Sequence, residues 1–219
     1  TQQFQVGANA NQTIVAATAN LRTTVYGHNQ NIASNGSGIG ASATQATAGT
    51  NGVTTGTVAI SGYLGTGTMT VAVSATAKAT ADQINALQAT TGVTATARTE
   101  VRLGGMAAGS YSLTLEGDNV GAARTVSFTL TSATGTDRLS AAVSAINDQS
   151  AKTGINASLS SDGSQIILTN ATGNNIVVGD TANANAANVT VTGYDAAGAA
   201  NGATTTLSSA AASVEFVNT

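Results

Sequence analysis

Hydrophobic and polar residues alternate along several short stretches of this chain, which is the pattern of strands buried on one side only. One example is a pair of stretches, Tyr111 to Leu115 and Val126 to Leu130, joined by the turn sequence Gly117-Asp118-Asn119. This arrangement predicts a β-hairpin. Further strands are predicted at 57–60, 68–73, 93–103, 155–159, 166–168, 176–178 and 189–191. Ser161-Asp162-Gly163-Ser164 predicts a tight turn between two of them.

A second pattern occurs twice. Residues 84–95 read INALQATTGVTA and residues 146–157 read INDQSAKTGINA. Both copies fit Ile-Asn, five residues, Thr-Gly, an aliphatic residue, any residue and Ala. A repeat without catalytic residue types indicates a duplicated structural unit.

Each copy of this motif predicts a short helix that passes directly into a strand. Gly92 and Gly154 supply the left-handed residue that ends a helix at low cost, and Val93 and Ile155 open the strands. In the first copy Thr80 and Gln83 suggest a capping box, and Ala81, Ile84 and Leu87 share one face. In the second copy Thr134 or Thr136 is the expected cap, and the apolar face is carried by Leu139, Val143 and Ile146. The motif residues singled out are Ile84, Asn85, Gly92, Val93, Ile146, Asn147, Gly154 and Ile155.

The expected fold is therefore α+β and predominantly β: short antiparallel sheets and hairpins, each covered by a short helix, repeated twice in an elongated chain. Residues 33–56 are rich in Gly, Ala, Ser and Thr and predict a loop or a weakly paired ribbon. Residues 195–206 have a similar composition and predict a linker. Residues 214–217 predict an extended end.

Composition narrows the possible functions. Charged residues are 8% of the chain, against roughly 25% in ordinary globular domains. The seven basic residues are scattered, so no nucleic-acid partner is expected, and no apolar run suggests membrane insertion. The chain has no Cys, which excludes disulfides, cysteine zinc sites and thiol catalysis.

Catalytic and cofactor patterns are weak. His28 is the single histidine, and no nucleophile motif accompanies it. The glycine-rich stretch 36–41 lacks the strand, helix and acidic residue that a dinucleotide site requires. Glu116, Asp118, Asp162 and Asp180 are explained better by turns than by a glycosidase pair or a metal site. We therefore expect no enzyme, no cofactor and no metal.

Among the possible small ligands, a sugar has the most support in the sequence, although that support is weak. Asn, Thr and Ser are abundant, and four tyrosines could offer stacking faces, namely Tyr26, Tyr63, Tyr111 and Tyr194. No Trp is present, and the tyrosines are far apart in sequence. The simpler interpretation is that they are core or rim residues with a polar tip.

Two features resemble a known family. Residues 4–14, FQVGANANQTI, look like the stretch of bacterial flagellins that follows their N-terminal helices. The doubled motif resembles the flagellin IN motif of variable outer domains and of filament-cap proteins. The long heptad-patterned helices through which flagellins polymerise have no counterpart in the chain. The resemblance implies the outer and upper-stalk region of a flagellin, with both terminal helical regions missing.

On this resemblance residues 1–30 and 205–219 belong to the upper part of the inner stalk, residues 31–104 form an outer module with the first motif, and residues 105–204 form a second. The implied function is a structural subunit of the flagellar filament, extracellular, that partners other subunits through the missing helices and is monomeric as a fragment. The alternative is a flagellin-like surface or cap protein that binds polysaccharide, host glycans or a host receptor.

Overall fold

The computed structural model describes residues 2–5, 13–16, 51–135, 137–195, 198–207, 209 and 215–218. For residues 2–5, 13–16, 201–203 and 215–218 it describes the backbone alone. By its internal packing the chain divides into two parts, residues 1–32 and 33–219. In the first part β1 (Gln2–Gln5) and β2 (Thr13–Ala16) pair as an antiparallel hairpin. His28, Tyr26 and residues 36–41 lie outside the described residues, as does most of the predicted loop 33–56.

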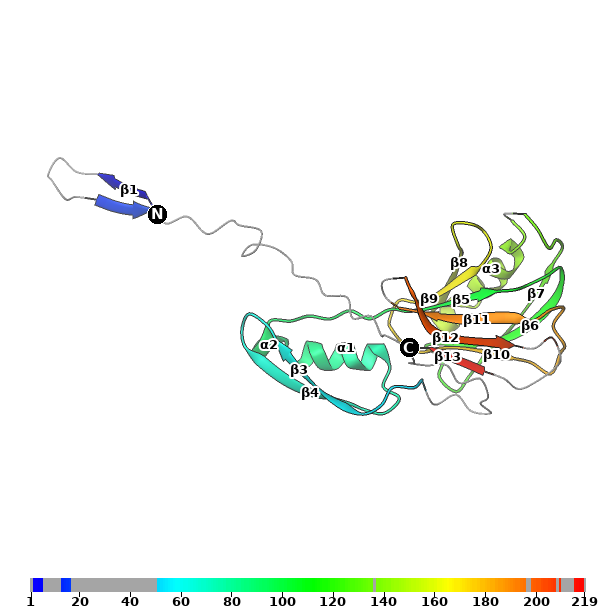
Figure 1. The fold of residues 1–219 in the computed structure, drawn as a ribbon, viewed down its shortest axis with the longest axis horizontal. Helices are drawn as coiled ribbons and strands as arrows, with labels where there is room; N and C mark the ends of the chain where they lie inside the picture. The colour runs from blue at the N-terminus through cyan, green and yellow to red at the C-terminus, as the bar shows by residue number, and fades with distance from the viewer. Residues whose placement is uncertain are drawn as a thin grey trace. The chain divides into compact units, whose positions relative to one another are not determined.

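The first repeat is a hairpin with a helix along it (Figure 1). β3 (Gly56–Ser61) pairs antiparallel with β4 (Thr66–Val71), and α1 (Ala77–Ala86) and α2 (Gln88–Thr91) follow. One face of the hairpin carries Val58, Ile60, Met69 and Val71, and the other carries threonines, alanine and serine. Both α1 and α2 pack on β4. The helices therefore cover the apolar face mainly over this one strand.

Three details of the first repeat correct the sequence predictions. The helix cap is Thr76, whose hydroxyl accepts a hydrogen bond from Ala79 N, while the predicted cap Thr80 lies inside the helix and donates back to Thr76 O. The predicted strand 68–73 ends at Val71, and Val73 lies beyond it and is 69% exposed. The predicted strand from Val93 begins only at Thr99. Between them Ala95 bonds to the side chain of Asn85.

The second repeat lies within two larger antiparallel sheets. One sheet has the order β13-β10-β6-β7, and the other β12-β11-β5-β9-β8. Their bounds are β5 (Thr99–Gly104), β6 (Gly109–Glu116), β7 (Arg124–Leu130), β8 (Ile155–Leu159), β9 (Ile166–Asn170), β10 (Ile176–Asp180), β11 (Val189–Tyr194), β12 (Ala200–Leu207) and β13 (Glu215–Asn218). The predicted β6–β7 hairpin, the turn at 161–164 and the extended end are all present.

These two sheets and one helix share a single core. Leucines, isoleucines and valines from both sheets form one buried cluster, together with Leu139, Ala142 and Ile146 of the helical segment. α3 (Ser140–Asn147), followed by α4 (Ser150–Thr153), packs on β7 and on β8, which are edge strands of the two sheets (Figure 1). The helix therefore closes one side of a β-sandwich, and the α+β, predominantly β class predicted from the sequence is confirmed.

Two further predictions about this region are wrong. Leu139 occupies the N-cap of α3 without a side-chain cap bond, and Thr134 instead closes a small turn with Ser132; Thr136 is outside the described residues. The predicted linker 195–206 contains β12, which pairs with β11 from Val189↔Leu207 onward. Its Thr-rich composition resembles a linker, but the alternate residues Thr205 and Leu207 are buried by the sheet.

The sandwich takes one strand from beyond the first motif. β5 follows the first repeat in sequence, yet it pairs with β9 and β11 of the five-stranded sheet. The turn after β9 also touches the first repeat, where Lys78 N donates to Gly173 O at 2.8 Å. Buried Asn51 donates to Asn175 Oδ1 at 3.1 Å. The first repeat is thus tied to the sandwich by backbone and amide hydrogen bonds.

Candidate functional site: the repeated motif

The asparagine of each motif copy binds the backbone of the alanine that ends the motif. Asn85 Nδ2 donates to Ala95 O at 2.9 Å, and Ala95 N donates to Asn85 Oδ1 at 2.8 Å. Asn147 makes the same pair with Ala157, at 3.0 and 2.7 Å. A side-chain amide that both donates to and accepts from one residue imitates a neighbouring strand. The fixed spacing of ten residues is therefore explained by this contact.

The threonine and glycine of each copy form the end of the helix. Thr91 and Thr153 are fully buried, and each hydroxyl donates to the carbonyl four residues earlier, Leu87 O and Gln149 O. Each hydroxyl also accepts from the amide two residues later. The next residues, Gly92 at φ 74° and Gly154 at φ 68°, adopt the left-handed conformation that favours glycine. Val93 is half-buried and Ile155 fully buried as the chain leaves the helix.

A hairpin turn packs against this helix end in both copies. A Cβ on Gly62 would lie 1.9 Å from Thr91 O, and a Cβ on Gly117 would lie 2.3 Å from Thr153 O. The residue that follows each turn glycine, Gly62 or Gly117, covers the left-handed glycine at the end of the helix. The Tyr63 ring lies over Gly92, and the Asp118 carboxylate lies over Gly154. This shared contact aligns β3 with β6, so that Val58 corresponds to Leu113 and Ile60 to Leu115.

Asp118 is the centre of the most concentrated polar network described. Its Oδ1 accepts hydrogen bonds from Asn170 Nδ2 at 2.8 Å, Asn174 Nδ2 at 2.9 Å and Thr172 Oγ1 at 3.1 Å. Partial burial acts to raise the pKa of Asp118, but the hydrogen bonds from Asn174, Asn170 and Thr172 together outweigh it and lower the pKa. A carboxylate held ionised in this way fixes the turn after β9 to the β6–β7 turn, and no acidic partner is present for general acid-base chemistry.

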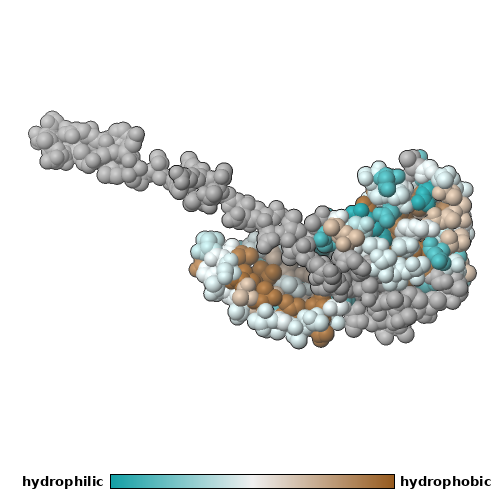
Figure 2. All heavy atoms as spheres, in the orientation of Figure 1, coloured by the Kyte–Doolittle hydropathy of each residue, from teal (hydrophilic) through white to brown (hydrophobic). Residues whose placement is uncertain are grey.

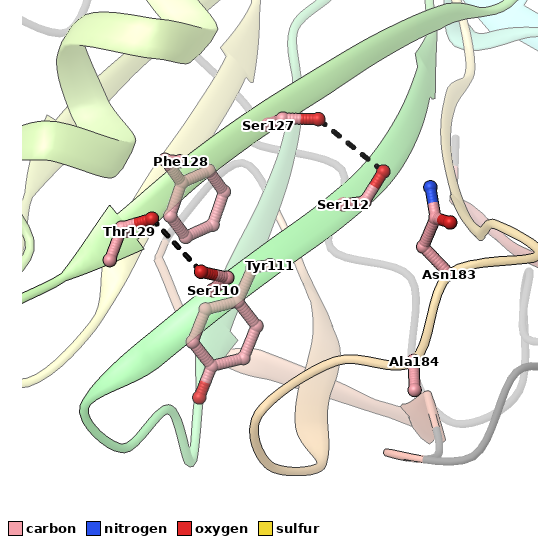
Figure 3. Close-up of a pocket in the computed structure, with 8 residues that line it drawn as sticks. All are labelled: Ser110, Tyr111, Ser112, Ser127, Phe128, Thr129, Asn183 and Ala184. Carbon is pink, nitrogen blue, oxygen red and sulfur yellow. Dashed lines mark hydrogen bonds between the residues drawn. The ribbon is translucent and has the colours of Figure 1, made fainter.

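The hollow over the β6–β7 hairpin offers hydroxyl groups rather than charged groups. It has a volume of about 370 Å³ and lies over the hairpin and the loop at Asn183 and Ala184 (Figure 3). Its hydroxyls pair with one another, Ser110 with Thr129 at 3.0 Å and Ser127 with Ser112 at 3.4 Å. Tyr111 and Phe128 stack with ring centroids 5.4 Å apart and are buried. The hollow contains no ionisable carboxylate, amine or imidazole.

The described tyrosines differ in how much ring they expose. Tyr111 is buried and bonds through its hydroxyl to the backbone of Ala107. Arg102 covers the ring of Tyr194 with its guanidinium 3.7 Å from the centroid, and Glu100 holds that guanidinium at 2.9 Å. Tyr63 is 85% exposed. Within the described residues no group of three or more His, Asp or Glu side chains could hold a metal ion. None of the described helices has the length and apolar character required to cross a bilayer.

The family comparison agrees with this geometry. The sequence model of the flagellin hook IN motif matches residues 57–109 and residues 112–172, together more than half of the chain. This chain belongs to the flagellin IN-motif family. No curated protein matches it significantly. Each matched range spans a hairpin, the helix pair and the segment that follows. A protein of this family is a flagellin-type structural protein, and the family implies assembly with other flagellin subunits at the flagellum, outside the cell.

The structure adds residues that the sequence analysis did not assign. The sequence pattern indicated Ile84 and Asn85 with their counterparts, but it predicted no partner for the asparagines and no role for Thr91 and Thr153. Their recurrence in both copies was the available signal, since a residue type repeated at one spacing indicates a repeated contact. Asp118 gave no such signal because its position in the first repeat is taken by Tyr63.

Proposed function

We propose that this chain is the surface-exposed region of a flagellin, a structural subunit of the bacterial flagellar filament that serves motility. The observation that carries the proposal is the doubled motif, whose shared asparagine and threonine side chains hold its own fold. The asparagine, threonine and glycine of each copy bind backbone within the repeat and leave no group directed at a ligand. Such residues suit a scaffold repeated along an assembly.

Charge supports the same role. The chain has a formal net charge of −3 over 219 residues and is rich in uncharged polar residues. Closely packed copies with strong charge of one sign would repel one another. We infer that residues 1–30 and 205–219 form the upper stalk and that residues 31–104 and 105–204 form the outer modules, so that the chain by itself is monomeric at low concentration.

Labelling of intact cells tests the filament proposal. Antibodies raised against the 219-residue chain should decorate filaments along their whole length in immunogold electron microscopy. Labelling confined to the filament tip would indicate a cap protein, and labelling of the cell body without filaments would indicate another surface protein. Pre-absorption of the antibodies with the purified chain is the control for specificity.

A glycan-binding surface protein is the second candidate, favoured by the exposed ring of Tyr63 and by the hydroxyl-lined hollow over Ser110 and Ser127. Exposed aromatic faces are a common platform for sugar rings. Titration against a polysaccharide panel should then show saturable binding that Tyr63→Ala removes. Tyr194→Ala is the matched control, because Arg102 already covers that ring. A flat titration with wild-type protein would eliminate this candidate.

A further inference from the structure

On the inner face of the first repeat Met69 is buried like its counterpart Val126, but Val58 is exposed where the second repeat has a core residue. Val58 is 43% exposed, whereas its counterpart Leu113 is 1% exposed. Figure 2 shows apolar atoms gathered on the visible face of the first repeat, in the region of β3, β4 and α1. The same motif is therefore present in one covered form and one uncovered form.

The second repeat shows what covers the corresponding strand edge. β6 pairs on its outer side with β10, antiparallel, over Leu113 to Glu116. The corresponding segment of the first repeat is Val58 to Ser61. In the described part of the chain β3 pairs only with β4. An isolated two-stranded hairpin is marginally stable, and three or more strands are usually needed for independent stability.

The free edge of β3 has a defined hydrogen-bonding pattern. Gly62 N donates to Gly65 O at 2.9 Å, which makes that pair a hydrogen-bonded one in the β3–β4 ladder. Because such pairs alternate along an antiparallel ladder, the backbone groups of Thr57, Ala59 and Ser61 point to the outer edge. All three residues are exposed. Among the described strands, this edge of β3 thus offers a row of donors and acceptors that no other strand takes up.

Nothing on this edge discourages pairing. Natural edge strands are protected by charged side chains, prolines or bulges. Residues 51–77 contain no charged residue, the chain contains no proline, and the β3–β4 register runs without a shift from Gly56 to Ser61. An uncharged edge of this kind meets no electrostatic repulsion from an identical edge.

We propose that β3 pairs antiparallel with β3 of a second copy of this chain. Side chains of the two strands stay on matching faces only if the two-fold axis passes through a residue, because a shift by one residue would place apolar beside polar positions. With the axis at Ala59, Val58 lies opposite Ile60 of the other copy and Thr57 lies opposite its Ser61. The result is a four-stranded sheet of two hairpins, with the strand number of the β13-β10-β6-β7 sheet.

The contact is small, since each copy contributes one short strand, so it forms weakly between free chains. The pairing itself is a property of the isolated chain and can be tested without filaments, so failure of one proposal leaves the other standing.

Disulfide trapping tests the pairing, and the absence of cysteine from the chain makes single substitutions unambiguous. Cα atoms of a hydrogen-bonded antiparallel pair are about 5.5 Å apart, within the range that a disulfide bridges. Ala59→Cys should give several-fold more covalent dimer on mild oxidation than Thr68→Cys, measured on non-reducing gels at equal concentration. Thr68 is the matched control because it pairs with Ala59 on the same outward face and is equally exposed, but lies on β4.

Equal trapping of the two variants, or greater trapping at Thr68, overturns the proposal. A second measurement does not depend on disulfide geometry. The weight-average mass of the wild-type chain in sedimentation equilibrium should rise with concentration, Ala59→Lys should abolish that rise, and Thr68→Lys should preserve it. A wild-type mass that stays monomeric up to millimolar concentration, or a rise that Ala59→Lys leaves intact, also overturns it. Far-UV circular dichroism checks that each variant is folded.

Discussion

The two repeats share one local structure but differ in what surrounds it. Both have an asparagine bound to an alanine ten residues later, a buried threonine and a left-handed glycine under a hairpin turn. Only the second repeat is enclosed, because six further strands of the two sheets surround its hairpin and β8. Its Ile146 is 1% exposed. The first repeat has a hairpin and two short helices, and its Ile84 is half-buried. The motif thus fixes a local shape, while burial depends on the strands supplied by the rest of the chain.

The largest difference is expected when a charge replaces the motif isoleucine. Ile146→Asp would place a carboxylate in the sandwich core and should cost more than about 4 kcal/mol. Ile84→Asp can keep its carboxylate hydrated and should cost about 1 to 2 kcal/mol. Hydrogen exchange with mass spectrometry should show loss of protection in β8 and β9 for the first variant, and in β3 and β4 alone for the second.

Ile146→Val is the control for loss of packing without charge, and it should cost about 1 kcal/mol. Equal destabilisation by the two aspartates would contradict the difference in burial on which the comparison rests.

The paired hydrogen bonds between each motif asparagine and its alanine form an asparagine clamp. Removing the clamp should show the same order between the two repeats, with smaller losses of stability. Asn147→Ala leaves the partly buried N–H and C=O of Ala157 without partners, and we expect a loss of about 2 kcal/mol in the free energy of unfolding. Asn85→Ala exposes Ala95 to water that can replace the amide, so the loss should be about 0.5 kcal/mol. Urea unfolding measures both. Asn156→Ala, a change of the same type on exposed β8 surface, should be neutral, and an equal loss there would show that the clamp is not responsible.

Substitution of the two helix-ending glycines distinguishes the cost of backbone strain from the cost of steric crowding. Gly92→Ala and Gly154→Ala both place a Cβ at positive φ, which costs about 1 kcal/mol in each. At Gly92 the new atom meets the exposed Tyr63 ring, which can swing away. At Gly154 it meets Asp118 Oδ2 at 2.0 Å, and moving that carboxylate disturbs its three hydrogen bonds. Thermal unfolding should therefore show the larger loss for Gly154→Ala. A larger loss for Gly92→Ala would mean that Tyr63 is held in place.

Acid should affect the second repeat through Asp118. Because its pKa is lower in the folded chain than its ordinary value of 3.8, folding is favoured by its ionised form. That contribution is fully present above pH 3.8 and is lost as the pH falls below 3.8 through the folded pKa. Asp118→Asn should make the melting temperature of the sandwich less dependent on pH in this acidic range.

Asp162, whose pKa is also lowered by hydrogen bonds from Ser160 and Ser164, titrates in the same direction. Asp162→Asn is therefore the necessary comparison for the Asp118 measurement. An unchanged pH dependence in Asp118→Asn would show that the network around Oδ1 does not stabilise the ionised form.

The sequence by itself determined the local elements of this protein. Alternation predicted the β6–β7 hairpin, because side chains of a strand point to opposite faces. The Thr-Gly pair predicted where each helix ends, since glycine adopts positive φ at least cost. The doubled motif was sufficient to indicate the flagellin family.

Only the tertiary structure decided which strands meet. β5 follows the first repeat but pairs within the second, and β12 forms from a threonine-rich segment because β11 supplies its partner. The Asp118 network joins residues more than 50 positions apart. Strand pairing depends on contacts between distant segments, whereas propensity and periodicity report only on neighbours. For the same reason two copies of one motif have different burial, and the edge of β3 remains free among the described strands.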